Sequence, residues 1–275
     1  MLPLWRDKVR IALCRDRLVV VHLRGGSRTH ILSKQVIPYS GTESGWQPVL
    51  AILENALKDK DWKKAEATVI LSNHFVRFLV LPWNEVTLTD AEQLAVAQHR
   101  FDEVYGADSA NWEFRLSEGP VGTPSMASAV PQDLLNQLKA IFKMSTMRLK
   151  SVQPYLMSAF NSCRRELGSE HGWFVLAERE SFCIGLVQGG QWSSIRLRHV
   201  AADWFEEALL VLEREALLTA DGNKFNKVFV HAPELFGFEL IKRGPWLLHP
   251  LKLNLLPGIS QAEIANYAIA STGLQ

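Results

Sequence analysis

The sequence has little cysteine, no long apolar run and no surplus of charge of either sign. Its three cysteines, Cys14, Cys163 and Cys183, are scattered and odd in number, which predicts reduced, buried thiols rather than disulfides or a metal site. No stretch approaches the roughly 18 uncharged apolar residues that a spanning helix needs, and the first residues carry charges too early for a signal peptide. A formal charge of +1 over 275 residues supplies no field that would attract nucleic acid or an anionic membrane. We therefore expect a cytoplasmic protein that has no nucleic-acid partner.

Several catalytic motifs are also missing. The chain contains no phosphate-binding Gly-x-x-x-x-Gly-Lys-Ser/Thr loop, no Gly-x-Gly-x-x-Gly, no Gly-x-Ser-x-Gly and no His-Glu-x-x-His. The eight histidines are dispersed, and the carboxylates that cluster on helices are typical of a solvated face. These observations give no candidate catalytic residue and no metal site.

What the chain does contain is a repeat. Residues 9–36 and 173–200 show the same pattern at an offset of 164 positions without a gap: strand, charged turn, strand, Gly-Gly turn, strand. Each copy continues into an amphipathic helix and then a further strand, at 46–57 and 67–72 in the first copy and at 204–217 and 227–231 in the second. A repeated unit of this kind predicts a duplicated fold with two similar lobes.

The remaining pattern alternates between strands and helices. A capping box at Thr89–Glu92 starts a helix whose Leu94, Ala97, Phe101 and Val104 are predicted to face the core. We expect an α/β fold with an N-terminal lobe at 1–153, a small inserted subdomain at about 84–147, and a C-terminal lobe at 154–275.

Short tracts through most of the chain resemble a known superfamily. They are Val69-Ile-Leu-Ser72, Val76-Arg77, Leu81-Pro82-Trp83, Trp112, Ala127-Ser-Ala-Val130, Leu134-Leu135, Ser151-Val-Gln-Pro154 and Asn254-Leu-Leu-Pro257. Together with the repeated meander and helix, they resemble the actin-like ATPase superfamily, and within it PilM-type pilus assembly proteins and the cytoplasmic domain of GspL-type secretion proteins. The resemblance implies a duplicated actin-like (RNase H-like) fold, with a mixed β-sheet flanked by helices in each lobe.

The first turn of each repeat is where that superfamily holds ATP. The resemblance implies an Asp near the metal, a Gly beside the phosphate and a Lys on the next strand, but the corresponding residues here are Ala12, Cys14 and Val19. The second turn offers at best Glu178, out of register, and the adenosine-side Gly-Gly turn is replaced by His231 and the two residues after it. We therefore predict a degenerate nucleotide site that binds no cofactor.

The resemblance also implies partners. We expect a non-catalytic scaffold at the inner face of the bacterial inner membrane, in a type IV pilus or type II secretion-like assembly platform. Its partner would be a PilN-like or GspL/GspM-like membrane protein, with the hexameric assembly ATPase as a second. Because no spanning helix precedes Gln275, we expect a separate membrane protein to recruit the chain, with Pro82 and Trp83 as candidate docking residues.

Two alternatives from other classes stay open. An active actin-like ATPase or kinase could use Asp16, Glu178 or Glu180 as a rewired metal site. A nuclease on the related RNase H-like framework would need several carboxylates at strand ends, and Ala12 and Leu176 at the equivalent positions make it the weaker alternative.

Overall fold

The computed structural model divides into two compact units, each built from separate segments of the chain. Unit 1 comprises Met1–Phe75, Gln132–Ser162 and Leu253–Gln275, and unit 2 comprises Val76–Pro131 and Cys163–Lys252. The residues described are 6–26, 29–40, 45–58, 62, 65–84, 89–117, 119–200, 204–219, 221–235, 243–253 and 255–273. The lobe boundaries expected from sequence order stay a prediction.

Unit 1 contains a five-stranded mixed sheet with the strand order β3-β2-β1-β4-β8. Its strands are β1 (Lys8–Leu13), β2 (Arg17–Arg24), β3 (His30–Pro38), β4 (Glu66–Leu71) and β8 (Arg148–Pro154). The first three form an antiparallel meander, whereas β1 pairs with β4, and β4 with β8, in parallel. Runs such as Val19–Val21 favour strands because β-branched side chains pack well on a pleated sheet.

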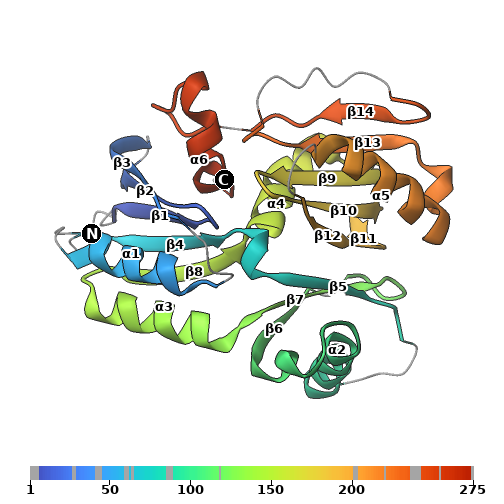
Figure 1. Ribbon diagram of the computed structural model, residues 1–275, viewed down its shortest axis with the longest axis horizontal. Coiled ribbons are helices and arrows are strands. Elements are labelled where there is room, and N and C mark those ends of the chain that lie inside the picture. The colour runs from blue at the N-terminus through green and yellow to red at the C-terminus, as the bar shows by residue number, and fades with distance from the viewer. Residues whose placement is uncertain are drawn as a thin grey trace. The chain divides into compact units, whose positions relative to one another are not determined.

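Among the described residues, four helices belong wholly or partly to unit 1. They are α1 (Gln47–Lys58), α3 (Gln132–Met144), α4 (Tyr155–Leu167) and α6 (Ile264–Ser271). Figure 1 shows α1 and α3 along one side of the sheet and α6 on the other side, over β1 and β2. The buried residues of α3, Leu134, Leu138 and Phe142, recur every four positions, which gives the helix one apolar face toward the sheet.

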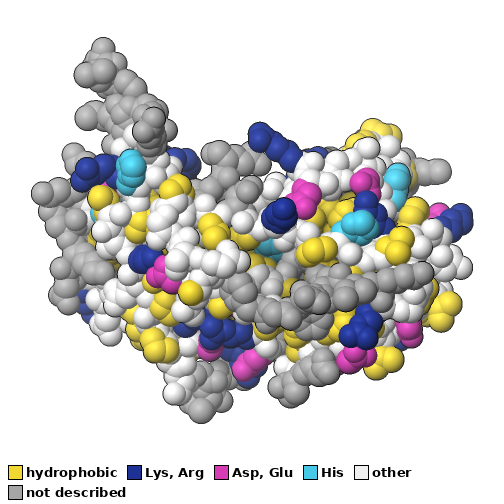
Figure 2. Space-filling model, turned by 90° about the horizontal axis from the view of Figure 1, so that it is seen from above, with side chains coloured by type: hydrophobic (Ala, Val, Ile, Leu, Met, Phe, Trp, Pro, Cys, Tyr) yellow, Lys and Arg dark blue, Asp and Glu magenta, His cyan; other side chains and the backbone are white. Residues whose placement is uncertain are grey.

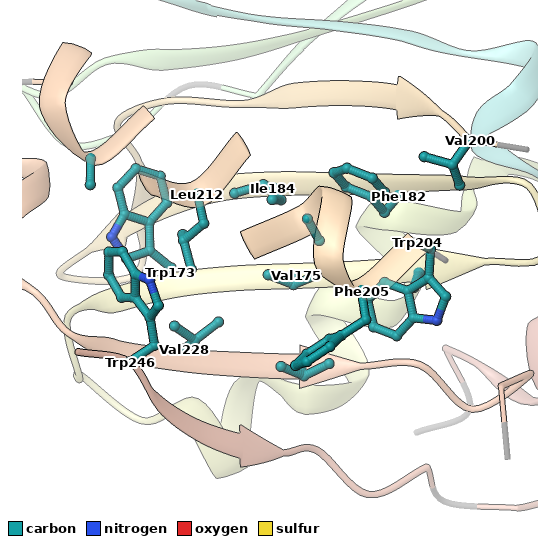
Figure 3. Close-up of a cluster of buried hydrophobic side chains, with 14 of the residues drawn as sticks. Trp173, Val175, Phe182, Ile184, Val200, Trp204, Phe205, Leu212, Val228 and Trp246 are labelled. Carbon is teal, nitrogen blue, oxygen red and sulfur yellow. The ribbon is translucent and has the colours of Figure 1, made fainter. Parts of the chain in front are cut away.

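The larger sheet of unit 2 has the order β11-β10-β9-β13-β14, and β12 also pairs with β10. Its strands are β9 (Gly172–Glu178), β10 (Ser181–Gln188), β11 (Gln191–Trp192), β12 (Arg196–His199), β13 (Lys227–His231) and β14 (Leu247–Pro250). Helix α5 (Trp204–Leu218) packs against this sheet through a core that includes Trp173, Trp204, Phe205 and Trp246 (Figure 3).

The smaller sheet of unit 2 has the order β5-β7-β6. It is formed by β5 (Arg77–Leu81), β6 (Trp112–Ser117) and β7 (Ser125–Pro131), with α2 (Asp90–Tyr105) beside it. The capping box at Thr89 and Glu92 is confirmed. The predicted burial on α2 is confirmed for Ala97 and Phe101 but wrong for Leu94 and Val104, which are 42% and 58% exposed. The reason is that a three-stranded sheet covers only a narrow stripe of the helix.

Short 3-10 turns complete the described elements at Asn73–Phe75, Ala107–Asn111, Gly222–Lys224 and Gln261–Glu263.

The predicted duplication is confirmed in strand order and in pairing register. Ile11 pairs with Val20 in the first meander and Val175 with Ile184 in the second, so adding 164 to each number of the first pair gives the second. The third strands differ, because β3 is a single strand of nine residues whereas its counterpart is divided into β11 and β12. Each unit therefore contains the same core topology of meander, helix and parallel strand.

Two expectations about composition are addressed by the described residues. The three cysteines are free thiols and all are buried, as the sequence predicts. None of the helices in the described part of the chain combines the length and apolar character required to cross a bilayer. On the face shown in Figure 2, basic and acidic side chains lie interspersed rather than gathered by sign.

Candidate functional site

The turn between β1 and β2 is closed by its own hydrogen bonds. The amide of Cys14 donates to the carbonyl oxygen of Arg17 at 3.0 Å, so this amide is already used within the hairpin. The Tyr39 hydroxyl donates to the carbonyl oxygen of Cys14 at 2.6 Å, and the Tyr39 amide donates to the carbonyl oxygen of Asp16 at 3.0 Å. Burial raises the pKa of the Tyr39 phenol, which keeps its hydroxyl protonated as a donor. The Cys14 amide and the carbonyl oxygens of Cys14 and Asp16 are therefore already bonded to protein groups.

The carboxylate at this turn is neutralised by a neighbouring guanidinium. Asp16 Oδ1 lies 2.7 Å from Arg17 Nη1, and the side chain of Arg17 is almost completely buried. Arg17 Nη2 also donates to the carbonyl oxygen of Ala265 at 3.4 Å, which connects the turn to α6. An Asp already paired with a buried Arg is a poor ligand for a divalent cation, because the cation would have to displace a fixed positive charge.

The two positions where the resemblance implies Asp and Lys face each other across the hairpin. Ala12 pairs with Val19 in the antiparallel register, and both are 0% exposed. Their side chains are part of the apolar interior of unit 1, and Cys14 beside them is also buried. A charged group at either position would lose its hydration without an opposite charge beside it.

The turn between β9 and β10 repeats this geometry in unit 2. The amide of Val200 donates to the carbonyl oxygen of Glu180 at 3.0 Å, as Tyr39 donates to Asp16 in the first turn. Glu178 is buried at the end of β9 and pairs with Ser181 at the start of β10, two residues before Cys183. Burial, together with the nearby Glu178 charge, raises the pKa of the Cys183 thiol well above its ordinary value, so this cysteine is a neutral core residue rather than a nucleophile.

His231 ends β13 inside unit 2 and has no exposed surface. Its Nδ1 lies 3.8 Å from Cys163 Sγ, and burial lowers the pKa of His231 to about 4 and raises the pKa of Cys163 to about 12. The pair is therefore neutral at pH 7 and lacks the thiolate that a Cys-His nucleophile requires. The chain then turns through Pro233, with the amide of Leu235 donating to the carbonyl oxygen of Ala232 at 3.1 Å.

A metal centre is not assembled anywhere in the described ranges. No group of three or more His, Cys, Asp or Glu side chains lies close enough there to hold an ion. Asp16 lies in unit 1, whereas Glu178 and Glu180 lie in unit 2. Asn254, the first residue of the Asn-Leu-Leu-Pro tract in the sequence, lies outside the described residues.

The candidate docking residues Pro82 and Trp83 follow the end of β5 in unit 2. Both are exposed, and the indole of Trp83 is 46% exposed. An exposed indole supplies a large, rigid contact surface, which is a common anchor in protein interfaces.

Two side chains that organise unit 1 were missed by the sequence reasoning. Tyr39 closes the first turn, and Arg10 on β1 donates from Nε to the carbonyl oxygen of Ala270 at 2.6 Å and from Nη2 to that of Thr272. Burial lowers the pKa of Arg10 to about 10. The available signal was an Arg flanked by apolar residues in the middle of β1, which predicts a buried cation but not its partner about 260 residues away.

The duplicated topology agrees with the likeness to solved structures: the chain has the actin-like ATPase fold. One solved structure with this likeness is the cytoplasmic domain of EpsL, an inner membrane component of the type II secretion system of Vibrio cholerae. It is 13% identical over 90% of each chain, with a TM-score of 0.56. The PilM-PilN type IV pilus biogenesis complex matches with 12% identity over 82% of this chain and 81% of the other, at a TM-score of 0.56. The fold expected from the sequence is confirmed.

A third similar structure is a protein of actin-like ATPase fold and unknown function from Bacteroides thetaiotaomicron. It is 11% identical over 82% of this chain and 81% of the other, with a TM-score of 0.53. No protein-family model matches the chain, and no curated protein sequence matches it.

Proposed function

We propose that the protein is a non-catalytic scaffold in the assembly platform of a type IV pilus or a type II secretion-like system. The observation that carries this proposal is the likeness to the EpsL cytoplasmic domain across 90% of both chains, joined to first-turn positions that are aliphatic and buried. The likeness to PilM in complex with PilN points to the same kind of platform.

The chemistry of the first turn supports the non-catalytic part of the proposal. A nucleotide cradle needs free backbone amides and a cation held by carboxylates. Here the Cys14 amide is bonded within the turn, Asp16 is paired with Arg17, and the Ala12–Val19 pair has no exposed surface. These contacts support a pseudo-ATPase whose fold is retained for protein binding.

The proposed partner is a membrane-anchored assembly protein of the PilN-like or GspL/GspM-like kind, and the second partner is the hexameric assembly ATPase. Recruitment by the first would place the protein at the cytoplasmic face of the inner membrane without a membrane contact of its own. Trp83, which is 46% exposed, is the proposed anchor for one of these partners.

Affinity purification from the native host tests the scaffold proposal. We expect the tagged protein to recover inner-membrane assembly proteins, and Trp83→Ala to reduce their recovery because truncation removes the anchor. Val121→Ala, which shortens a side chain that is 87% exposed on the same unit, is the matched control and should leave recovery unchanged. Recovery of only metabolic or nucleic-acid-processing proteins would contradict the proposal.

Calorimetric titration with ATP and Mg²⁺ tests the non-catalytic part separately. We expect no binding in the micromolar range. Micromolar binding that disappears in Glu178→Ala would instead support the rewired ATPase, since that buried carboxylate would then be acting on the cation.

A further inference from the structure

One open groove lies on unit 1, between the end of α3 and the edge strand β8. It encloses about 450 Å³ and is lined by Phe142, Met147 and Leu149 at its apolar part and by Lys139, Lys143 and Lys150 at its rim. Phe142 and Met147 are buried, whereas the three lysines are exposed. The groove thus combines an apolar floor with a basic rim.

The charge of the rim is of one sign. Lys139 and Lys143 are four residues apart on α3, so they project from the same face of the helix. Within the described residues neither makes an ion pair, and no acidic side chain lines the groove. Lys150 is 3.6 Å from Glu66 on β4 and its side chain is still 61% exposed.

The backbone of β8 supplies a second recognition element. Among the described strands, β8 pairs only with β4, which makes it an edge of the five-stranded sheet. The backbone groups of an edge strand that do not face their neighbour are directed to the open side and can pair with another extended chain. The lining residues 149–152 belong to this strand, so the groove runs along an open sheet edge.

The wall of the groove is fixed by a short turn. Ser145 Oγ donates to the carbonyl oxygen of Phe142 at 3.0 Å and accepts from the amide of Met147 at 3.2 Å. These bonds hold the end of α3 against the start of β8, so the groove is formed before any ligand arrives. A preformed site loses less conformational entropy on binding.

We propose that this groove binds an acidic, extended segment of a partner protein, which adds as a strand to β8 while its carboxylates pair with Lys139 and Lys143. Four residues of β8, 149–152, line the groove and span about 13 Å, so an extended segment of about four to six residues would lie along it. A lipid headgroup would use the lysines but not the sheet edge or the apolar floor. The inference rests on the proposed function only in assuming that the natural ligand is a protein.

A labelled synthetic peptide of alternating Glu and Val, eight residues long, is the probe, and fluorescence anisotropy measures its binding to the full chain. We expect Lys139→Glu with Lys143→Glu to weaken binding at least about tenfold, because two attractive pairs become repulsive. Arg164→Glu with Arg165→Glu changes the net charge equally on another exposed helix end and should change affinity less than about twofold.

A second peptide, in which Pro replaces every Val, keeps the charge but loses alternate N–H donors. Binding to this peptide should fall at least about tenfold, because proline cannot donate to the β8 edge. Equal binding of the two peptides, equal losses in the two protein variants, or no binding of the first peptide would overturn the inference. Binding of phosphatidylglycerol vesicles that is lost in the Lys139/Lys143 variant, without peptide binding, would assign the groove to lipid instead.

These outcomes can be told apart from failure of the scaffold proposal. If assembly proteins are still recovered by the Lys139/Lys143 variant and the peptide does not bind, the groove fails and the scaffold proposal stands. If the peptide binds as expected but no assembly protein is recovered from the host, the groove stands and the scaffold proposal fails.

Discussion

Ala12 and Val19 are paired across β1 and β2 with no surface exposed to solvent. Restoring the implied carboxylate, Ala12→Asp, is expected to lower the free energy of unfolding by about 3–5 kcal/mol, because a charge is buried without a partner. Denaturant titration measures the change, and Ala51→Asp on the exposed side of α1 is the control, with an expected change below about 0.5 kcal/mol. An Ala12→Asp protein as stable as the wild type would contradict the prediction, because position 12 would then accept a carboxylate without cost.

His231 gives a prediction about pH. Its pKa is lowered from 6.5 to about 4 in the folded protein by burial, so between these values the unfolded chain binds a proton that the folded chain does not. Stability is therefore expected to fall by up to about 3 kcal/mol as the pH drops from 6.5 to 4.

Denaturant titrations at several pH values check this. His231→Gln should flatten the profile between pH 4 and 6.5, whereas His99→Gln, which alters an exposed ring, should leave it as in the wild type. An unchanged slope in His231→Gln would assign the acid sensitivity to other groups.

At the level of single residues, the sequence predicts which groups the first turn lacks, and that stays a prediction, whereas the contacts that close the turn become visible only in the structure. The replacement of Asp, Gly and Lys by Ala12, Cys14 and Val19 is visible in the sequence. Two contacts are not visible in the sequence: Tyr39 closes the turn, and Arg17 neutralises Asp16. Both depend on where β3 and α6 pack. Periodicity locates a side chain on a strand, but it does not give the partner that lies across the sheet.

Among the elements, α6 offers a second prediction about pH. Glu263 precedes this helix, and its pKa is lowered to about 2 by hydrogen bonds from Lys34 and Ser260. A carboxylate with a folded pKa below its ordinary 4.5 stabilises the fold above that value, and this contribution disappears as the pH falls from 4.5 to 2. Glu263→Gln should remove this part of the acid sensitivity.

Hydrogen exchange of the α6 amides between pH 3 and 5 provides the readout. In the wild-type protein we expect the protection of these amides to decrease as the pH is lowered. In Glu263→Gln we expect lower protection at pH 5 and a smaller change of protection between pH 5 and pH 3. Glu166→Gln changes an exposed carboxylate on α4 and should behave as the wild type. If both variants behaved alike, the pair between Lys34 on β3 and Glu263 would not be responsible.

The order of the elements followed from the sequence, but the extent of their contacts did not. The predicted strand 227–231 matches β13, and Gly189 and Gly190 form the predicted turn between β10 and β11. The exposed Leu94 and Val104 show the opposite case, because a helical stripe of apolar residues indicates burial only where a partner surface is wide enough. The division of the last meander strand into β11 and β12 likewise had no signal in the repeat.

For the molecule as a whole, nucleotide is expected to leave thermal stability unchanged. A ligand present at 100 times its dissociation constant would add about 2.7 kcal/mol, which corresponds to about 5–10 °C in the unfolding temperature for a chain of this length. Differential scanning fluorimetry with 1 mM ATP and Mg²⁺ should show no such shift relative to inorganic phosphate at equal ionic strength. A shift of this size with ATP alone would support the ATPase alternative.

The duplication is the feature of the whole molecule that the sequence revealed most directly. An ungapped offset of 164 predicted both meanders, and the same offset relates the strand pairs Ile11–Val20 and Val175–Ile184. Sequence order gave no indication that Leu253–Gln275 groups with Met1–Phe75, because contacts between distant segments are not encoded in local pattern.

The position of α6 has a consequence for synthesis on the ribosome. Arg10 and Arg17 are translated near the start, whereas the carbonyl oxygens to which they donate, on Ala265, Ala270 and Thr272, are translated near the end. Until those residues emerge, the nascent β1 and β2 lack their covering helix and offer an apolar surface that favours chaperone binding. The segment Cys163–Lys252 is translated before α6, so we expect β1 and β2 to acquire their final contacts after that segment has been made.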